Sequence, residues 1–148
     1  MKIEAINLEK KFGNKYAVNN ISFVIPESET IGLLGPNGCG KTTTIGMMLG
    51  LIKPSSGIIK IDDQDINKVE RVKILEKVNF ASPYIELPKR LTVRQNLEVF
   101  GKLYGIVNLD QRIIEIAQDL DLKKFLDKKT GELSSGQKNR VSLAKSLL

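Results

Sequence analysis

A glycine-rich stretch at residues 35–44, GPNGCGKTTT, has the residue types and spacing that bind phosphate. Glycines let the backbone wrap closely enough for successive N–H groups to point at phosphate oxygens. Lys41 is placed to reach the β and γ phosphates of a nucleoside triphosphate, and a helix beginning near it adds a positive N-terminal end. The Thr42 hydroxyl is placed to ligate Mg²⁺. The predicted phosphate-binding loop (P-loop) and its flank comprise Gly35, Pro36, Asn37, Gly38, Cys39, Gly40, Lys41, Thr42 and Thr43.

The alternative is a turn that only joins a strand to a helix, because chance matches to G-x-x-x-x-G-K-[ST] occur. The context favours a phosphate site. The apolar run Ile31 to Leu34 reads as a short strand before the loop, and residues 40–51 have a helical pattern after it. Alone, the motif indicates only a nucleoside triphosphate site of the kind that kinases, GTPases and motors share.

The elements that must position this loop follow from the spacing of apolar residues. Residues 2–8 and 17–25 alternate as half-buried strands do, and residues 58–62 read as another strand. Residues 67–77 look like a charged helix that runs into an apolar stretch at residues 78–81. Because β and α segments alternate, we expect a mostly parallel sheet.

The second half of the chain has a helical pattern. Thr92 and Gln95 form a capping box, and Gly105 closes the helix that begins there. Residues 110–120 and 136–148 read as two further helices, so we expect a helical insert at about residues 84–134.

Composition limits the classes of function. The 148 residues are 41% hydrophobic and 27% charged, which is typical of about one globular domain. A single cysteine, and no apolar stretch near the ~18 residues that a membrane span needs, favour a reducing, cytosolic compartment. The net charge is +6, but acids separate the lysines, so we expect a solvated basic surface and no nucleic-acid partner.

A second stretch, LSSGQ at residues 133–137, precedes the last expected helix. The N–H groups and hydroxyls of Ser134, Ser135 and Gly136 are placed to grip a phosphate at that helix N-terminus. Ser134 with Gln137 also fits a capping box, so the alternative is that these residues only cap their own helix. The two roles are compatible, since a capped N-terminus is what binds an anion.

With LSSGQ-x-x-R following the P-loop, the chain resembles the ATP-binding-cassette (ABC) ATPases, whose signature is usually Leu-Ser-Gly-Gly-Gln. The resemblance covers essentially all 148 residues, including LTVRQNL and LYG, and within the family is nearest to the ATPase subunits of exporters. It implies an α/β fold, a P-loop NTPase core with an N-terminal antiparallel β layer and a helical insert, with the C-terminal part of the core missing. The implied single partial domain divides into residues 1–83 (β layer and P-loop core), 84–134 (helical subdomain) and 135–148 (signature helix).

The resemblance also implies a mechanism. Two nucleotide domains pair head to tail, and the signature of one covers the γ-phosphate held by the P-loop of the other. The implied cofactors are ATP and Mg²⁺, with Thr42 on the metal, and the implied partners are a second such subunit and an integral membrane permease that docks around residues 84–105. Such a subunit lies in the cytoplasm, peripheral on the inner face of the cell membrane. The implied catalytic residues are Lys41, Ser134 and Gly136, with Ser135 and Gln137 also in contact with nucleotide.

Phe12 stands where the family carries an aromatic ring that stacks on adenine, a contact worth about 1 kcal/mol. We expect Phe12 in that role and Val18 against the same base. The alternative is a core phenylalanine of the β layer, because Tyr16 is nearby and aromatic residues usually pack.

Several residues depart from the family pattern. Pro83 stands where the family has a glutamine that contacts Mg²⁺ and water, and Ser135 replaces the usual first glycine of the signature. The run IIKIDD at residues 58–63 imitates the acidic strand of P-loop ATPases, but Lys60 interrupts it, so we interpret it as an edge strand and a turn. The chain also has no histidine, so we expect a truncated piece of an ATP hydrolase. The complete domain would hydrolyse ATP, whereas this piece, without the acidic pair and the histidine, would bind ATP without turning it over.

Two other classes of function remain open at this stage. One is a soluble ABC ATPase that acts on ribosomes or nucleic acid, and the other is a regulatory module that binds ATP without hydrolysing it. The former would usually show tandem cassettes or a long coiled-coil insertion, and neither is visible in these residues. A further hypothesis, from position alone, is that alkylation of Cys39 blocks nucleotide binding.

Overall fold

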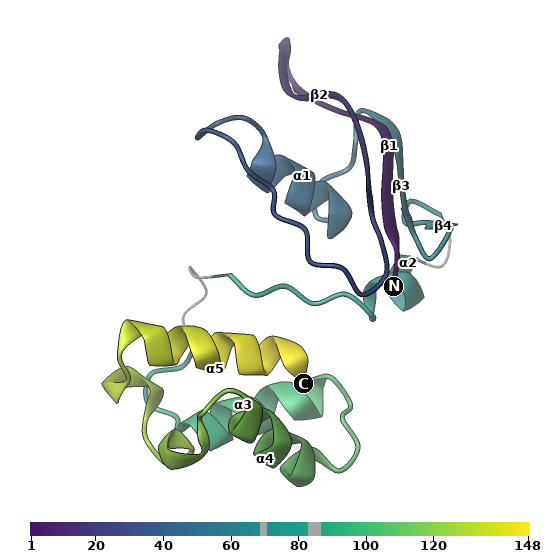
Figure 1. Cartoon of the computed structure of the whole chain (residues 1–148). Coiled ribbons are helices and arrows are strands. Elements are labelled where there is room, and N and C mark those ends of the chain that lie inside the picture. The colour runs from purple at the N-terminus through teal and green to yellow at the C-terminus, as the bar shows by residue number, and fades with distance from the viewer. Residues whose placement is uncertain (69–70, 83–86) are drawn as a thin grey trace. The chain divides into compact units, whose positions relative to one another are not determined.

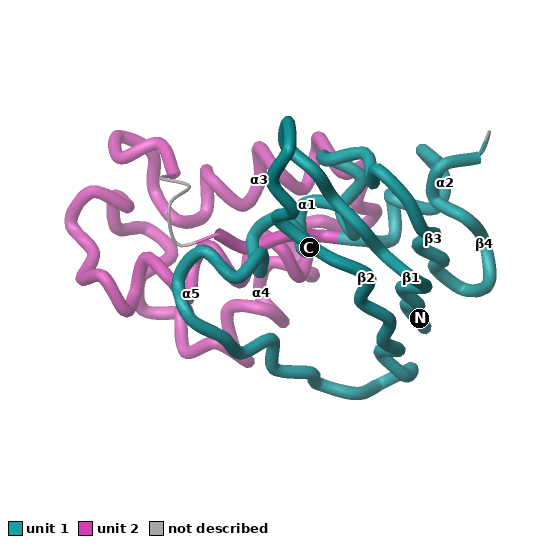
Figure 2. The backbone as a smooth tube through the Cα atoms, turned by 90° about the horizontal axis from the view of Figure 1, so that it is seen from above, with its two compact units in different colours: residues 1–78 teal, residues 79–148 magenta. Residues whose placement is uncertain are grey.

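The computed structural model describes residues 1–68, 71–82 and 87–148. These residues form two compact units, residues 1–78 (unit 1) and 79–148 (unit 2), coloured separately in Figure 2. Pro83, the expected departure from the family pattern, lies outside the described residues, as does the boundary expected after it.

Unit 1 contains a four-stranded antiparallel sheet with the strand order β2-β1-β3-β4 (Figure 1). The two long N-terminal strands pair as a hairpin, with Phe12 opposite Lys15 at its turn. The two predicted N-terminal strands are therefore confirmed, and both are longer than expected because the hairpin pairing extends to its turn. The strands are β1 (Ile3–Phe12), β2 (Lys15–Ile25), β3 (Ser56–Ile61) and β4 (Gln64–Asp65).

The prediction of a mostly parallel sheet is wrong for the described residues, whose strand pairs are all antiparallel. The predicted strand at Ile31 to Leu34 is also absent, and Leu34 is 91% exposed. Residues 78–81 form no strand either. A strand exists only through backbone hydrogen bonds to a neighbour, and the described sheet brings no neighbour to these apolar runs.

Two helices accompany the sheet in unit 1. Helix α1 (Lys41–Met48) follows the P-loop, and the left-handed Gly50 stands two residues after its end, so the helix predicted at residues 40–51 is confirmed but shorter. Helix α2 (Arg71–Leu75) covers only part of the expected 67–77. The core of unit 1 combines residues from the sheet and both helices: Ala5, Leu8, Val18, Met47, Ile59, Ile61, Ile66 and Ile74.

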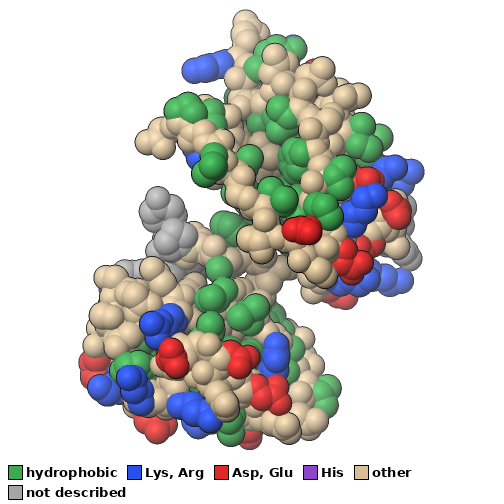
Figure 3. Space-filling model, in the orientation of Figure 1, with side chains coloured by type: hydrophobic (Ala, Val, Ile, Leu, Met, Phe, Trp, Pro, Cys, Tyr) green, Lys and Arg blue, Asp and Glu red, His purple; other side chains and the backbone are tan. Residues whose placement is uncertain are grey.

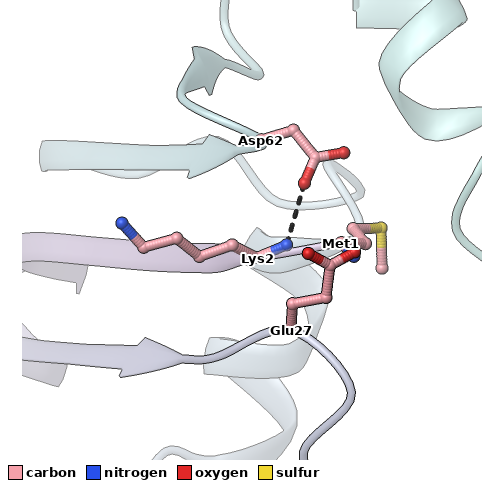
Figure 4. A network of polar contacts seen from close by, with 4 residues as sticks. All are labelled: Met1, Lys2, Glu27 and Asp62. Atoms are coloured by element: carbon pink, nitrogen blue, oxygen red, sulfur yellow. Dashed lines mark hydrogen bonds and ion pairs between the residues drawn. The ribbon is translucent and has the colours of Figure 1, made fainter.

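The IIKIDD run lies in β3 and the turn that follows it. β3 is not an edge strand as expected, because the short β4 pairs with Lys60 and Ile61. The turn is confirmed, and its Asp62 carboxylate accepts a hydrogen bond of 2.8 Å from the backbone N–H of Lys2 (Figure 4). The Met1 ammonium group lies 2.7 Å from Glu27 in the same view. Asp62 thus ties the end of β3 to the start of β1.

Unit 2 is helical. Its helices are α3 (Val93–Leu103), α4 (Leu109–Asp119) and α5 (Ser135–Leu147), with 3-10 turns η1 (Lys123–Phe125) and η2 (Thr130–Glu132) between the last two. The Thr92–Gln95 capping box is confirmed, and Gly105 follows α3 in the left-handed conformation. The buried apolar core is Val93, Leu97, Ile113, Ile116, Ala117, Leu122, Leu126, Leu133, Val141 and Ala144.

Candidate functional site

The P-loop has a backbone that glycine makes possible. Gly38 and Gly40 have φ angles of +83° and +94°, a region that L side chains rarely adopt. Gly40 is the N-cap of α1, and a Cβ built there would lie 2.2 Å from the carbonyl oxygen of Ala17 in β2. The missing side chain therefore lets the start of α1 pack directly on β2. This contact is not visible in the sequence, because Ala17 carries no motif.

Lys41 lies in the P-loop as its position in the motif predicts. Its ammonium nitrogen Nζ donates hydrogen bonds of 2.7 and 2.8 Å to the carbonyl oxygens of Gly35 and Pro36. Cys39 is exposed, and its Sγ lies 3.8 Å from the same nitrogen. The loop thus holds a fixed positive charge among exposed backbone groups.

The threonines after Lys41 differ in exposure. Thr42 is exposed and Thr43 is half-buried at the start of α1. Thr44 is buried, and its hydroxyl donates to the Gly40 carbonyl at 3.0 Å. The side chain that the sequence assigns to Mg²⁺ is therefore the more exposed of the first two.

Phe12 and Val18 lie on different parts of the hairpin. Phe12 is 56% exposed at the end of β1, and the Lys10 ammonium lies 5.1 Å from the centroid of its ring. The alternative of a core phenylalanine is therefore wrong. Val18 is only 5% exposed and belongs to the core of unit 1, beside Gly40. Its surface is mostly occupied by packing, whereas the Phe12 ring is available to a ligand.

The second motif begins α5 in unit 2. Ser134 is the N-cap, with its Oγ accepting from the N–H of Gln137 at 3.3 Å, and the Gln137 side chain accepts from the N–H of Ser134 at 2.9 Å. The capping box is therefore present. Ser135 and Gly136 are exposed in the first turn, where backbone N–H groups have no acceptor within the helix. The first turn of α5 is therefore exposed at these two residues.

These groups fit a nucleoside triphosphate. The P-loop offers an ammonium group, left-handed glycines and the N-terminus of an eight-residue helix, which together are the usual partners of a phosphate tail. The P-loop lies in unit 1 and the LSSGQ motif in unit 2. None of the helices in the described ranges combines the length and the hydropathy that a membrane span requires.

Comparisons with known proteins identify the family. The family model "ABC transporter" matches residues 18–148. The chain is 39% identical to a Nod factor export ATP-binding protein I from Burkholderia lata, over 99% of this chain and 48% of that protein. It is 40% identical to the zinc import ATP-binding protein ZnuC from Rickettsia bellii, over 99% of this chain and 57% of that protein. The chain thus spans about half the length of the curated relatives it matches.

Solved structures agree with this result. CbiO1 from Clostridium perfringens, part of the ABC transporter complex cbiONQ, superposes with a TM-score of 0.86 and 28% identity, over 98% of this chain and 60% of that one. A dimeric ATP-binding cassette in a post-hydrolysis state with ADP and phosphate has a TM-score of 0.79 and 26% identity, over 97% of this chain and 68% of that one. The expected α/β ABC ATPase fold is confirmed. The chain belongs to the ABC transporter family and carries part of an ATP-binding domain.

Proposed function

We propose that this protein binds MgATP as the nucleotide-binding subunit of an ABC transporter, and that ATP-driven dimerisation and hydrolysis power export through a separate membrane permease. The observation that carries the proposal is the Lys41 ammonium group held at the carbonyl oxygens of Gly35 and Pro36. The transport role itself follows from family membership and from the relatives' names.

The residues of unit 1 bind and orient the nucleotide. Gly38, Gly40 and the first turn of α1 direct backbone N–H groups at the phosphates, and Lys41 neutralises their charge. The Thr42 hydroxyl would hold Mg²⁺, and a metal bound there would supply positive charge to the phosphates. Phe12 stacks on adenine, since its ring is the exposed aromatic surface at the end of β1. Val18 packs beside Gly40.

The residues of unit 2 act on a second subunit. The N–H groups of Ser135 and Gly136 at the start of α5 bind the γ-phosphate that the P-loop of the partner presents. Ser134 and Gln137 hold this turn through their capping box. The dimer of the related cassette in its ADP-bound state supports such pairing. ATP then joins the two subunits, because each nucleotide contacts both.

The permease docks on the helical unit, at the surface expected around residues 84–105. Exposed apolar side chains lie at the end of α3 and just after it. Leu103, the last residue of the helix, is 72% exposed, and Val107 is 80% exposed. Val99 and Tyr104 add to the same stretch. Such a surface favours a protein partner. The subunit accordingly lies in the cytoplasm, on the inner face of the cell membrane.

The direction of transport that we propose is export. The relatives include both import and export ATP-binding proteins, so family membership alone leaves the direction open. The repeated similarity to Nod factor export proteins supports export.

A soluble ABC ATPase acting on nucleic acid gains no support from the surface. On the face of unit 2 shown in Figure 3, Lys and Arg side chains lie among Asp and Glu side chains and do not gather in a single basic stripe. A nucleic-acid footprint is usually such a stripe.

The experiment that tests the proposed function measures three properties of the protein in its full natural length. MgATP binding by calorimetry, ATPase activity, and co-purification with an integral membrane permease from the source cell are each compared with Lys41→Ala. We expect the wild type to show all three properties. Lys41→Ala should lose MgATP binding and ATPase activity but still co-purify with the permease. A wild type that binds no ATP, or binds ATP but no permease, would contradict the proposal.

A further inference from the structure

Two distant segments of unit 2 are joined by hydrogen bonds just ahead of the signature turn. We call the pair of segments 88–94 and 126–131 the clasp. It joins the start of α3 to the chain that leads into α5 (Figure 1). Backbone N–H groups on both sides donate across it: Val93 to Lys128 at 3.0 Å, Arg94 to Leu126 at 2.9 Å, Thr130 to Leu91 at 3.0 Å and Gly131 to Lys89 at 3.0 Å.

Two buried polar side chains lie at the centre of the clasp. The Thr130 hydroxyl donates to the carbonyl oxygen of Pro88 at 2.7 Å, and Asn96 Nδ2 lies 3.3 Å from the same oxygen. Asn96 Nδ2 also donates to the Thr92 carbonyl at 3.0 Å and lies 3.5 Å from Thr130 Oγ1. The two side chains thus converge on the carbonyl oxygens of residues 88–92.

One buried polar atom in the clasp lacks a hydrogen-bond partner within the part of the chain that the structure describes, which lowers the stability of the fold. Asn96 is 1% exposed, and its Oδ1 has no hydrogen-bond partner among the described residues. An unpaired buried carbonyl is unfavourable, whereas an apolar residue at this helix position would pack without that penalty. Reversing the amide would bring Oδ1 against backbone carbonyl oxygens, which is worse. Polar groups retained at such a cost commonly fix one particular arrangement of the chain.

The clasp is connected directly to the signature. Thr130 begins η2, and the N–H of Leu133 donates to the Thr130 carbonyl at 3.4 Å. Leu133 is 5% exposed in the core, and the next residue is Ser134, the N-cap of α5. A shift of Thr130 must therefore move the turn that presents Ser135 and Gly136.

We propose that Asn96 and Thr130 are positioning residues that fix the signature turn, residues 134–136, for contact with the phosphate bound to a partner subunit. The inference rests on the proposed function of that turn. Neither side chain contacts the nucleotide. Each acts through the backbone of residues 88–92 and 131–133, so its loss affects the closed dimer and turnover but leaves nucleotide binding at the P-loop intact.

The test compares four variants of the protein in its full natural length. Thr130→Val removes the hydroxyl at nearly constant volume, and Thr130→Ser keeps it. Ile116→Val, in α4 of the same core but outside the clasp, is a control for lost stability. Asn96→Leu is a second variant at the other side chain, in case Thr130→Val expresses poorly.

Two readouts separate positioning from general destabilisation. In hydrogen exchange without nucleotide, amides of residues 131–138 should exchange about tenfold faster in Thr130→Val than in Ile116→Val, because lost buried hydrogen bonds loosen the turn. In kinetics, kcat for ATP and the ATP-dependent dimer affinity should fall about tenfold in Thr130→Val, with KM and monomer ATP affinity unchanged. Thr130→Ser should behave as wild type.

The possible results distinguish a failure of the positioning role from a failure of the proposed function. If Thr130→Val and Asn96→Leu exchange and turn over as Ile116→Val does, while the wild type dimerises with ATP, the positioning role is wrong and the proposed function stands. The same holds if both variants lose monomer ATP affinity instead. If exchange changes as expected but the wild type never dimerises with ATP, the clasp holds the turn and the proposed function is wrong.

Discussion

The ammonium nitrogen of Lys41 lies 2.7 Å from the carbonyl oxygen of Gly35, so the charge of the P-loop is held at the loop's own backbone. Lys41→Ala should weaken MgATP binding at least about tenfold, because hydrogen bonds to charged groups contribute about 1.5–3 kcal/mol. Calorimetry measures the affinity. Lys77→Ala removes an exposed charge from the same unit and should leave it unchanged. Equal affinities for Lys41→Ala and wild type would remove Lys41 from the site.

Gly40 and Gly38 form a matched pair for testing the loop's packing. Both have positive φ angles, but a Cβ at Gly40 would lie 2.2 Å from the Ala17 carbonyl, whereas a Cβ at Gly38 meets nothing within 4 Å. Gly38→Ala should cost about 1 kcal/mol from backbone strain, and Gly40→Ala should cost more, about 2–3 kcal/mol, because α1 must also move away from β2. Thermal unfolding gives both values. Equal losses would show that the contact with β2 is unimportant.

Phe12 tests base recognition separately from phosphate binding. Phe12→Ala should weaken ATP binding about fivefold, since stacking contributes about 1 kcal/mol, and leave the affinity for inorganic tripolyphosphate unchanged. The ring is 56% exposed, so the melting temperature should hardly move. Tyr16→Ala, which removes a 43% exposed ring from the same hairpin, is the control and should bind ATP normally. A parallel loss of tripolyphosphate affinity in Phe12→Ala would argue against stacking.

Ser134 separates capping from phosphate contact. Ser134→Ala removes the cap and should lower the free energy of unfolding by about 1 kcal/mol. Ser134→Asp keeps a good cap, so stability should be retained, but its negative charge faces the partner's phosphate and should abolish ATP-dependent dimerisation. Denaturant unfolding and light scattering measure the two effects. If Ser134→Asp dimerised like the wild type, the turn would be only a cap.

Cys39 offers a chemical probe of the loop. Its exposed Sγ lies 3.8 Å from Lys41 Nζ, so a maleimide attached there should crowd the phosphate position and lower ATP affinity. Cys39→Ser treated in the same way should bind as the untreated protein does. Full labelling of Cys39 with no change in ATP affinity would contradict the hypothesis that modification of this thiol blocks nucleotide binding.

Local signals in the sequence predict the helix starts and caps at both motifs. The positive φ angles of the P-loop glycines and both capping boxes depend on residues within a few positions of one another, such as Ser134 and Gln137. The type of each residue then determines the backbone nearby. The helices that follow Lys41, Thr92 and Ser134 were therefore predicted correctly, with ends displaced by a few residues.

Long-range relationships were not accessible in this way. The run Ile31 to Leu34 is apolar enough for a strand, but strand formation requires a neighbour, and none of the described strands lies beside it. The exposure of Phe12 depends on where the hairpin ends, not on its own sequence. The contact of Asn96 with Thr130 joins residues 34 apart, and nothing in either residue's local pattern indicates it.

The most direct test of the central claim is the mass of the full-length protein in solution at saturating, non-hydrolysable MgATP analogue. Light scattering should give twice the monomer mass, and Lys41→Ala in the P-loop or Ser134→Asp in the signature turn should each restore the monomer. A wild type that binds the analogue and remains monomeric would contradict a site shared between the P-loop of one subunit and the signature of another.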